Sequence, residues 1–321
     1  MNRGPWILQP YGGLKKFIGQ SAQVHIRAPF FKKAYLDRVL HRSTIQLLRF
    51  HFSLFLLPVY LFAISQLPVV DVRLAMLVFF ILHGLVYPAS NGYNSYMDRD
   101  ESPIGGLKKP MQPTNQLFYV TVFMDIMAVV LSLFISLYFA LCILFYILAS
   151  RAYSYRGIRL KRFPVLGFLV VFLFQGALVF FCTYHGAHPQ HPLHVPLLPC
   201  FVSSLLIGAS YPLTQIYQHE QDKKDGVITL SYRLGVRGTF VFSMMLFLLA
   251  TAGMYVVLQV NYFFLFLLCL SPVVLFFLTW MRAAWQHAEA ANFKNSLRMN
   301  VISTICMLVY FSTLIILQHF E

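Results

Sequence analysis

Six of the eleven acidic residues gather in two short polar segments, and side chains of this kind could hold a metal ion. The first segment covers residues 91–110 and contains Asp98, Asp100 and Glu101. Asn94 lies four residues before Asp98, so the two side chains share one face of a helix. Carboxylate and amide oxygens suit Mg²⁺, which is commonly bound by one or two carboxylates together with the phosphates of a substrate. The segment therefore indicates a magnesium–phosphate site, with a capped and solvated loop as the simpler alternative.

The second acidic segment, residues 211–235, carries its polar side chains at helical spacing. Gln218, Asp222 and Asp225 stand at positions i, i+4 and i+7, which lie on one helical face. Glu220 points elsewhere on a regular helix, although a frayed helix end would bring it to the same side. A polar helix end is again the alternative interpretation. It is less favoured here than for the first segment, because two acidic segments on the same side of the membrane are less easily explained as ordinary helix ends.

A third polar segment is purely basic. Residues 151–164 contain no acid and five cations, which are Arg151, Arg156, Arg159, Lys161 and Arg162. One guanidinium group can donate two hydrogen bonds to phosphate oxygens at once. This segment could therefore bind a diphosphate beside the two acidic segments. For any single arginine, the alternative is the general excess of positive charge in the cytoplasmic loops of membrane proteins.

The elements that must position these side chains are membrane helices. The chain of 321 residues is 58% hydrophobic and 11% charged, whereas soluble domains have about 25% charged residues. Its apolar runs are long and continuous rather than alternating, which favours helices over a β-barrel. Nine spans are predicted, at about 45–66, 72–94, 116–134, 137–152, 164–184, 196–217, 238–258, 262–281 and 299–318. The predicted fold class is therefore all-α, a polytopic membrane protein.

The chain divides into a short lead-in and one membrane domain. Residues 1–43 are polar and basic, and we expect a surface-lying amphipathic segment there. Residues 44–321 are predicted to form a single transmembrane domain that holds all three polar segments.

The distribution of charge predicts the orientation of this domain. The net charge is +14, and 24 of the 25 Lys and Arg residues fall on the N-terminal side of the predicted bundle, with Arg73 as the exception. This bias places the N-terminus and both acidic segments in the cytoplasm, in a bacterial inner membrane or an equivalent membrane. Because the cations occupy short loops between apolar spans, we exclude a nucleic acid as partner.

The two acidic segments occupy equivalent places, since one follows span 2 and the other follows span 6. That spacing predicts two four-helix pseudo-repeats plus one helix, in which the facing polar loops form one site. Two charged side chains lie within the predicted spans and must be kept away from the lipid hydrocarbon. Asp125 lies in span 3 and should face the bundle interior, whereas Arg49, at the start of span 1, reaches either an acidic acceptor or lipid phosphates.

Together these segments resemble the UbiA superfamily of intramembrane prenyltransferases, which has nine helices and an Asp-rich motif after helix 2 and after helix 6. The first family motif, NDxxDxxxD, matches Asn94 and Asp98. Ser95 and Ser102 stand at two positions where the family usually has Asp, so Asp100 or Glu101 would replace the last acid. The resemblance extends from about residue 45 to residue 318.

The second family motif, DxxxD, falls on Gln218 and Asp222, so its first Asp is replaced. Glu220 is the acid that could compensate. The stretch from Tyr153 to Lys161 in the basic segment also resembles the family.

The resemblance implies a prenyltransferase that moves an isoprenyl group from a prenyl diphosphate to an aromatic or other acceptor within the membrane. The implied catalytic residues are Asn94, Asp98 and Asp222. Mg²⁺ would be held by acids of both motifs, Asp98, Asp100, Glu220, Asp222 and Asp225. The diphosphate would be bound by cations of the basic segment, Arg151, Arg156, Arg159 and Lys161.

Two other functions stay open at this point. A degenerate relative could bind a lipid diphosphate without turnover, since some motif acids are replaced. A transporter would place its polar residues near the middle of the bilayer, whereas only Asp125 is deep here. If the protein is a transferase, then hydroxybenzoate, a naphthoate, homogentisate, a tetrapyrrole and a glycerophosphate are all compatible acceptors.

Overall fold

The computed structural model describes residues 40–319, so most of the predicted lead-in lies outside the described residues. Within the described part, nine helical segments are long and apolar enough to cross a membrane. These spans are Arg42–Ser65, Val72–Asp98, Asn115–Ser132, Leu137–Ser154, Pro164–Ala187, Leu197–Lys224, Leu230–Val257, Val260–Gln286 and Phe293–Gln318. The only pairing of extended backbone in these residues is an isolated bridge between Ile104 and Leu107. The predicted all-α membrane bundle is confirmed.

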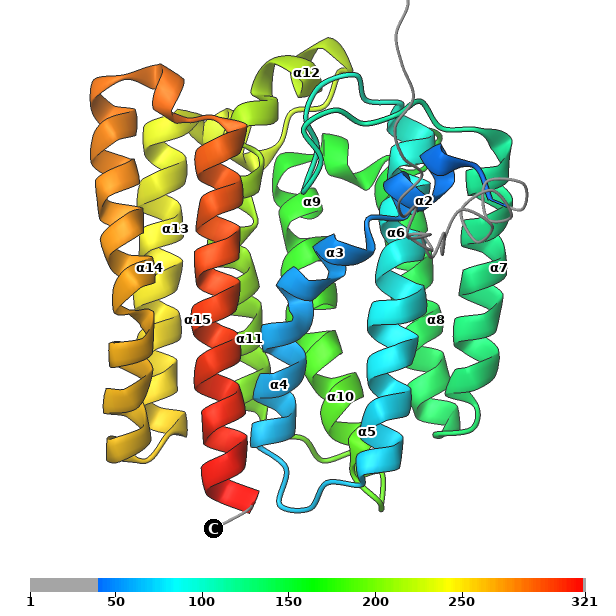
Figure 1. The fold of residues 1–321 in the computed structure, drawn as a ribbon, viewed down its shortest axis with the longest axis vertical. Coiled ribbons are helices and arrows are strands. Elements are labelled where there is room, and N and C mark those ends of the chain that lie inside the picture. Colours follow the sequence, from blue (N-terminus) through cyan, green and yellow to red (C-terminus); the bar gives the residue numbers. More distant parts are fainter. Residues whose placement is uncertain (1–39, 320–321) are drawn as a thin grey trace, which may run out of the picture. The chain divides into compact units, whose positions relative to one another are not determined.

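Five of the spans consist of one helix each. They are α7 (Asn115–Ser132), α8 (Leu137–Ser154), α13 (Leu230–Val257), α14 (Val260–Gln286) and α15 (Phe293–His319). Of these, α13 is kinked at Gly235. In Figure 1, α7 and α8 stand on one side of the bundle, and α13, α14 and α15 stand on the other. The four remaining spans, which are interrupted, lie between these groups and carry most of the polar side chains described below.

Spans 1 and 6 are broken near one end. Span 1 consists of α2 (Arg42–Leu48), α3 (Phe50–Ser53), the turn η1 (Leu54–Leu56) and α4 (Leu57–Ser65). Span 6 consists of α11 (Leu197–Ser210), the turns η5 (Pro212–Thr214) and η6 (Ile216–Gln218), and α12 (His219–Lys224). In lipid, such irregular backbone is tolerated where protein surrounds it or where it lines a cavity.

Spans 2 and 5 each contain a wider π-helical turn. Span 2 runs through α5 (Val72–Phe79), the π-helix η2 (Phe80–Val86) and α6 (Tyr87–Asp98). Span 5 runs through α9 (Pro164–Val171), the π-helix η4 (Phe172–Leu178) and α10 (Val179–Ala187). Pro164 begins α9 because a proline at the first helical position loses no intrahelical hydrogen bond. Turns of the π type occur often at functional sites.

The π-helix η4 presses directly against α11. A Cβ atom added to Gly176 would lie 2.3 Å from the Cα atom of Ser204, so only glycine fits at this crossing. The Ala177 N–H, next in the chain, donates to the Ser204 hydroxyl at 2.9 Å. The wider turn therefore gives a backbone donor to the neighbouring helix and brings spans 5 and 6 together.

The loop after α6, residues 99–114, is held over the end of the bundle by span 1. The Gln46 side chain donates to the Lys109 carbonyl at 3.3 Å and accepts from the Met111 N–H at 2.8 Å. His51 is hydrogen-bonded to the Gly106 carbonyl at 3.2 Å. Figure 1 shows this loop and α12 at the same end of the bundle, where spans 2 and 6 both terminate.

Candidate functional site

A polar cavity of about 180 Å³ opens at the end of the bundle where spans 2 and 6 terminate. Four carboxylates from the two acidic segments line it, and these are Asp98, Asp100, Asp222 and Asp225. Gln218 lines the same cavity, and its amide donates to the Pro103 carbonyl at 3.4 Å, which links the two segments directly. Two segments more than a hundred residues apart in the chain thus contribute to one cavity.

The side chains of Asn94 and Glu220 have different environments. Asn94 lines the cavity from α6 and donates from its amide nitrogen to the Ser154 hydroxyl at 3.0 Å, which fixes the orientation of the amide. Glu220 is exposed and does not line the cavity. Because α12 is a regular turn of helix, Glu220 faces away from the side that carries Asp222.

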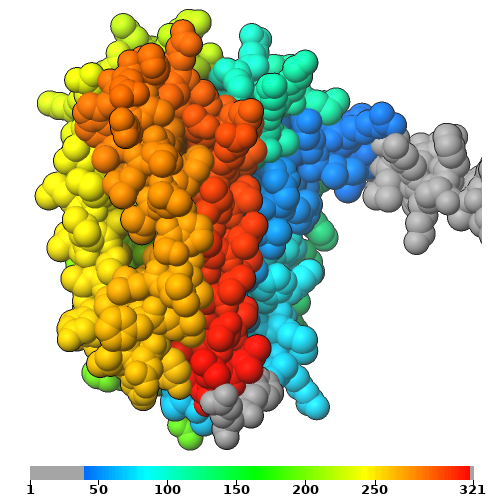
Figure 2. All heavy atoms as spheres, turned by 60° about the vertical axis from the view of Figure 1, so that its left-hand side comes forward, coloured from blue at the N-terminus to red at the C-terminus, as the bar shows by residue number. Residues whose placement is uncertain are grey.

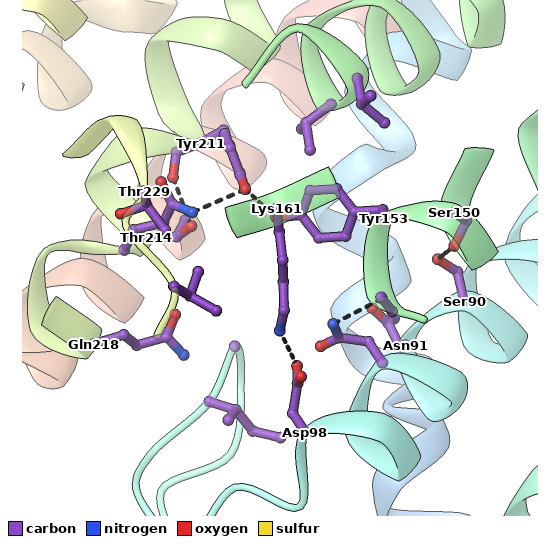
Figure 3. A pocket seen from close by; sticks show the side chains of 18 of the residues that line it. Ser90, Asn91, Asp98, Ser150, Tyr153, Lys161, Tyr211, Thr214, Gln218 and Thr229 are labelled. Carbon is purple, nitrogen blue, oxygen red and sulfur yellow. Dashed lines mark hydrogen bonds and ion pairs between the residues drawn. The ribbon is translucent and has the colours of Figure 1, made fainter. Parts of the chain in front are cut away.

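Two cations of the basic segment reach the acids. Lys161 lines the cavity and donates a hydrogen bond to the Asp98 carboxylate, as Figure 3 shows. The Arg159 guanidinium lies 3.6 Å from a carboxylate oxygen of Asp98 and 3.6 Å from one of Asp225, and it also donates to the Asp225 carbonyl at 2.9 Å. Arg159 therefore connects the ends of spans 2 and 6 through opposite charges, whereas Lys161 pairs with Asp98 of span 2.

Of the four predicted diphosphate ligands, only Lys161 lines this cavity, and Arg151 and Arg156 contact other groups. Arg151 forms an ion pair with Asp125 of α7, donates to the Thr121 hydroxyl at 3.2 Å, and lies 3.8 Å above the Tyr93 ring. Arg156 is exposed and donates to the Met97 carbonyl at 2.7 Å. The deep acid Asp125 thus finds its partner on the neighbouring helix α8.

Arg49 is a cavity residue whose place the sequence only suggested. It is 6% exposed, lines the cavity, and donates to the carbonyls of Asn91 at 3.0 Å and Gly105 at 3.3 Å. Its Nε atom is buried and has no hydrogen-bond partner in the described part of the chain. A lone arginine in the first apolar span was the signal, and it faces the cavity rather than lipid phosphates.

Three arginines around the cavity adopt the left-handed backbone conformation. Arg49, Arg99 and Arg159 have φ values of 48°, 55° and 50°. This region is uncommon for residues other than glycine, and such strain is often retained at functional sites. Arg49 separates α2 from α3 and Arg99 ends α6, so two of the three bend the chain where it meets the cavity.

The electrostatics of the cavity favour an added cation. Burial, and next the negative charge of Asp98, raise the pKa of Asp100 to about 6, although Lys161 and Arg49 act in the opposite direction. One oxygen of the Asp98 carboxylate, Oδ1, is buried and accepts no hydrogen bond among residues 40–319. The acids thus retain negative charge that the neighbouring side chains do not fully balance.

The donor chemistry of this cavity fits Mg²⁺ that shares its coordination with a phosphorylated substrate. No three His, Cys, Asp or Glu side chains in the described residues converge closely enough to hold a metal ion on their own. Mg²⁺ retains water and substrate phosphate oxygens as ligands and needs only one or two carboxylates from the protein. The cavity acids and the amide oxygens of Asn91, Asn94 and Gln218 supply hard donors of that kind.

A second, mostly apolar cavity of about 200 Å³ adjoins the polar one. The two cavities share seven lining residues, which are Phe52, Ser90, Asn91, Tyr146, Gln175, Tyr211 and Thr214. Gln175, on the π-helix η4, and Tyr146, on α8, both lie at this boundary. The hydroxyl groups of Tyr153 and Tyr211, both labelled in Figure 3, form a hydrogen bond with each other near this boundary. A ligand could therefore place a charged head in the polar cavity and an apolar body in the second.

Comparison with solved structures shows the same fold in several UbiA homologues. A UbiA homologue from Archaeoglobus fulgidus, solved bound to DMAPP and Mg²⁺, matches with a TM-score of 0.63 and 17% identity over 85% of this chain and 99% of that chain. The apo UbiA homologue from Aeropyrum pernix K1 matches with a TM-score of 0.63 and 17% identity over 83% of this chain and 98% of that chain. A digeranylgeranylglyceryl phosphate synthase matches with a TM-score of 0.56 and 21% identity over 85% of this chain and 98% of that chain.

Sequence comparison assigns the family. Among curated proteins no match to the chain was found. The family model for the UbiA prenyltransferase family matches residues 53–302, which include both acidic segments and the basic segment. Together with the nine apolar spans found in residues 40–319, this match identifies an integral, multi-pass membrane protein. The chain belongs to the UbiA prenyltransferase family.

Proposed function

We propose that this protein transfers an isoprenyl group from a prenyl diphosphate to an acceptor inside the membrane, with Mg²⁺ as cofactor. One observation carries the proposal: an acid- and cation-lined cavity adjoins an apolar cavity within the same bundle. A prenyl diphosphate has the same division, with a charged head and a hydrocarbon tail. Solved UbiA homologues from Archaeoglobus fulgidus bound to DMAPP with Mg²⁺ and to GPP with Mg²⁺ support this choice of substrate class.

The cations of the polar cavity would bind the diphosphate. Lys161 and Arg49 line it, and Arg159 lies behind Asp98 and Asp225. Mg²⁺, held by Asp98, Asp100, Asp222 and Asp225 with the amide of Asn94, would stabilise the charge that develops on the departing diphosphate. Asp98 already pairs with Lys161, so a bound diphosphate would compete with this carboxylate for the ammonium group.

The reaction breaks one bond and makes one. The C1–O bond of the allylic diphosphate breaks, and its electron pair leaves with the diphosphate oxygen. An electron pair of the acceptor then forms the new bond to C1, and the acceptor loses one proton, which the diphosphate takes up. Tyr146 and Tyr211 line both cavities, and Tyr153 lines the polar one. The faces of these rings would stabilise an allylic cation by about 0.5–2 kcal/mol for each contact.

The test is a transfer assay on membranes that contain the full chain. Radiolabelled geranyl, farnesyl and geranylgeranyl diphosphates are supplied with Mg²⁺, and labelled lipid products are identified. We expect Asp98→Ala and Asp222→Ala to abolish transfer, while Glu289→Ala, an exposed acid in the turn before α15, keeps it. Full activity in both aspartate variants would reject the site.

Two further outcomes have defined meanings. Diphosphate binding by the unaltered chain, with no product for any acceptor, would identify a lipid-diphosphate binder without turnover. Labelling of single cysteines placed in the loop after α6 tests orientation, since we propose that this loop and the polar cavity face the cytoplasm. Labelling only from the opposite side of the membrane would reverse that orientation.

A further inference from the structure

The C-terminal helix α15 presents polar side chains to the apolar cavity. Asn300, Ser303 and Thr304 all line it, and their positions i, i+3 and i+4 place them on one face of the helix. Asn300 is seven residues into α15, which corresponds to about 10 Å along the helix axis. Figure 2 shows α15 in red, packed beside α14 over this side of the bundle. The polar row therefore lies well inside the span rather than at its end.

Two buried hydroxyl groups of this cavity lack a hydrogen-bond partner in the described part of the chain. They are those of Ser303 and Tyr87. Tyr87 is 1% exposed and Thr304 is 8% exposed, so bulk water does not reach them freely. A buried hydroxyl without a partner costs free energy, and a ligand that carries a hydroxyl or carbonyl group would remove that cost.

No charged side chain lines the apolar cavity among the described residues. A carboxylate placed there would lose its hydration and find no cation to pair with, which is strongly unfavourable at membrane depth. Arg49, Lys161 and the acids all line the adjoining polar cavity instead, which the diphosphate would fill. The apolar cavity thus selects against anionic ligands.

A prenyl tail alone does not explain this lining. Hydrocarbon would leave Tyr87, Asn300, Ser303 and Thr304 without hydrogen bonds. We propose that the apolar cavity binds the acceptor beside the prenyl tail, that the acceptor is an uncharged apolar molecule bearing a hydroxyl group, and that Asn300, Ser303 and Thr304 hold it. This inference rests on the proposed transferase function and narrows its substrate class.

The test compares two acceptors that differ in one carboxylate. The full chain in lipid nanodiscs is given radiolabelled geranyl diphosphate with either 2-naphthol or 6-hydroxy-2-naphthoate at pH 7.5. We expect kcat/KM for 2-naphthol to exceed that for the carboxylate by at least about tenfold, because only the carboxylate must shed a charge in the cavity. Equal or better use of the carboxylate would overturn the inference and leave the transferase standing.

Variants of α15 test which residues hold the acceptor. Ser303→Ala and Asn300→Leu should raise KM for 2-naphthol by about tenfold through lost hydrogen bonds, with KM for geranyl diphosphate unchanged. Thr251→Val is the matched control, since Thr251 bonds to the backbone of its own helix and lines neither cavity. A change of prenyl-length preference with unchanged acceptor KM would assign the cavity to the tail alone and overturn the inference.

Direct binding separates this inference from the proposed function. Equilibrium dialysis of tritiated 2-naphthol and of its carboxylate against the nanodiscs needs no catalysis. Selective binding of the naphthol that Ser303→Ala weakens, with no transfer from any prenyl diphosphate, would keep the inference and reject the transferase. Absence of selective binding would reject the inference. Size-exclusion profiles identify any variant that fails to fold, and Ser303→Ala, which removes one oxygen, is the least disruptive.

Discussion

The ammonium group of Lys161 donates a hydrogen bond to the carboxylate of Asp98, 63 residues earlier in the chain. Their side chains are 11% and 5% exposed, so the pair is largely shielded from water. Loss of one partner of a buried ion pair costs about 3–5 kcal/mol, mostly because the other charge remains buried. Lys161→Met should therefore lower the melting temperature and abolish binding of geranyl diphosphate.

A double variant separates the two effects of Lys161. In Asp98→Asn/Lys161→Met both charges of the pair are removed, so neither remains buried without a partner. The melting temperature should therefore recover most of the loss caused by Lys161→Met alone. Binding of geranyl diphosphate should stay absent, because the cavity has lost a cation. Recovery of binding in the double variant would show that Lys161 serves only to neutralise Asp98.

The ion pair of Arg151 and Asp125 joins α7 to α8 outside the polar cavity. Arg151→Met alone should destabilise the protein by about 3 kcal/mol, since Asp125 would remain as an unpaired acid within the membrane. The double variant Arg151→Met/Asp125→Leu should recover stability and keep its affinity for geranyl diphosphate, measured by equilibrium dialysis. A tenfold loss of affinity in the double variant would instead make Arg151 a diphosphate ligand.

Stability should depend on pH through Asp100. Burial raises the pKa of this carboxyl from its ordinary value of 3.8 to about 6 in the folded protein, so the folded state binds the proton more tightly than the unfolded state. This contribution to stability is fully present below pH 3.8 and is lost as pH rises through 6, about 3 kcal/mol in total. Without divalent cations, Asp100→Asn should melt higher than the unaltered chain at pH 7.5 and equally at pH 4.

Added Mg²⁺ provides the control for that pH profile. Above pH 6 the ionised Asp100 should be stabilised by the metal ion together with a diphosphate, so the melting temperature of the unaltered chain should rise. Asp100→Asn should gain less from the same addition. An identical gain in both proteins would remove Asp100 from the proposed metal ligands.

The contact between Gly176 and Ser204 should tolerate no side chain. Gly176→Ala would bring a methyl group to 2.3 Å from the Ser204 Cα atom, which forces spans 5 and 6 apart and costs about 1–3 kcal/mol or more. Gly238→Ala in α13 is the matched control, because its nearest neighbour is the Leu234 side chain at 3.2 Å. Thermal melts in detergent that are equal for both variants would contradict the close crossing.

The nine spans could be predicted because long apolar runs in lipid have few alternatives to helix. The predicted boundaries were less accurate where polar residues continue a helix beyond the apolar core. Span 7 was expected to begin near residue 238, whereas α13 begins at Leu230, where the Thr229 hydroxyl accepts from the Tyr232 N–H. A kink at Gly235, whose φ of 67° is not helical, separates this first turn from the rest of α13. Arg233 and Arg237 lower hydropathy on both sides of this kink, so the apolar run used for the prediction starts only after it.

The site was only partly predictable. Helical spacing brought Gln218, Asp222 and Asp225 to one side, and all three line the cavity. The five cations of the basic segment look alike in sequence, however, and only the packing of α8 against α7 separates Arg151 from Lys161. The signal for that separation was Asp125, since an acid deep in a span requires a partner.

The π-helix η4 determines which way Gln175 faces. Each residue turns an α-helix by about 100°, and a π-turn fits one extra residue into the same rise of the chain. Deletion of a single residue between Phe172 and Leu178 would convert the π-helical turn to α-helix. The side chains of α9 would then be rotated about the helix axis relative to those of α10. An alignment with any relative whose fifth helix is regular should therefore open a one-residue gap in mid-membrane; without that gap, Gln175 would be matched to a lipid-facing position.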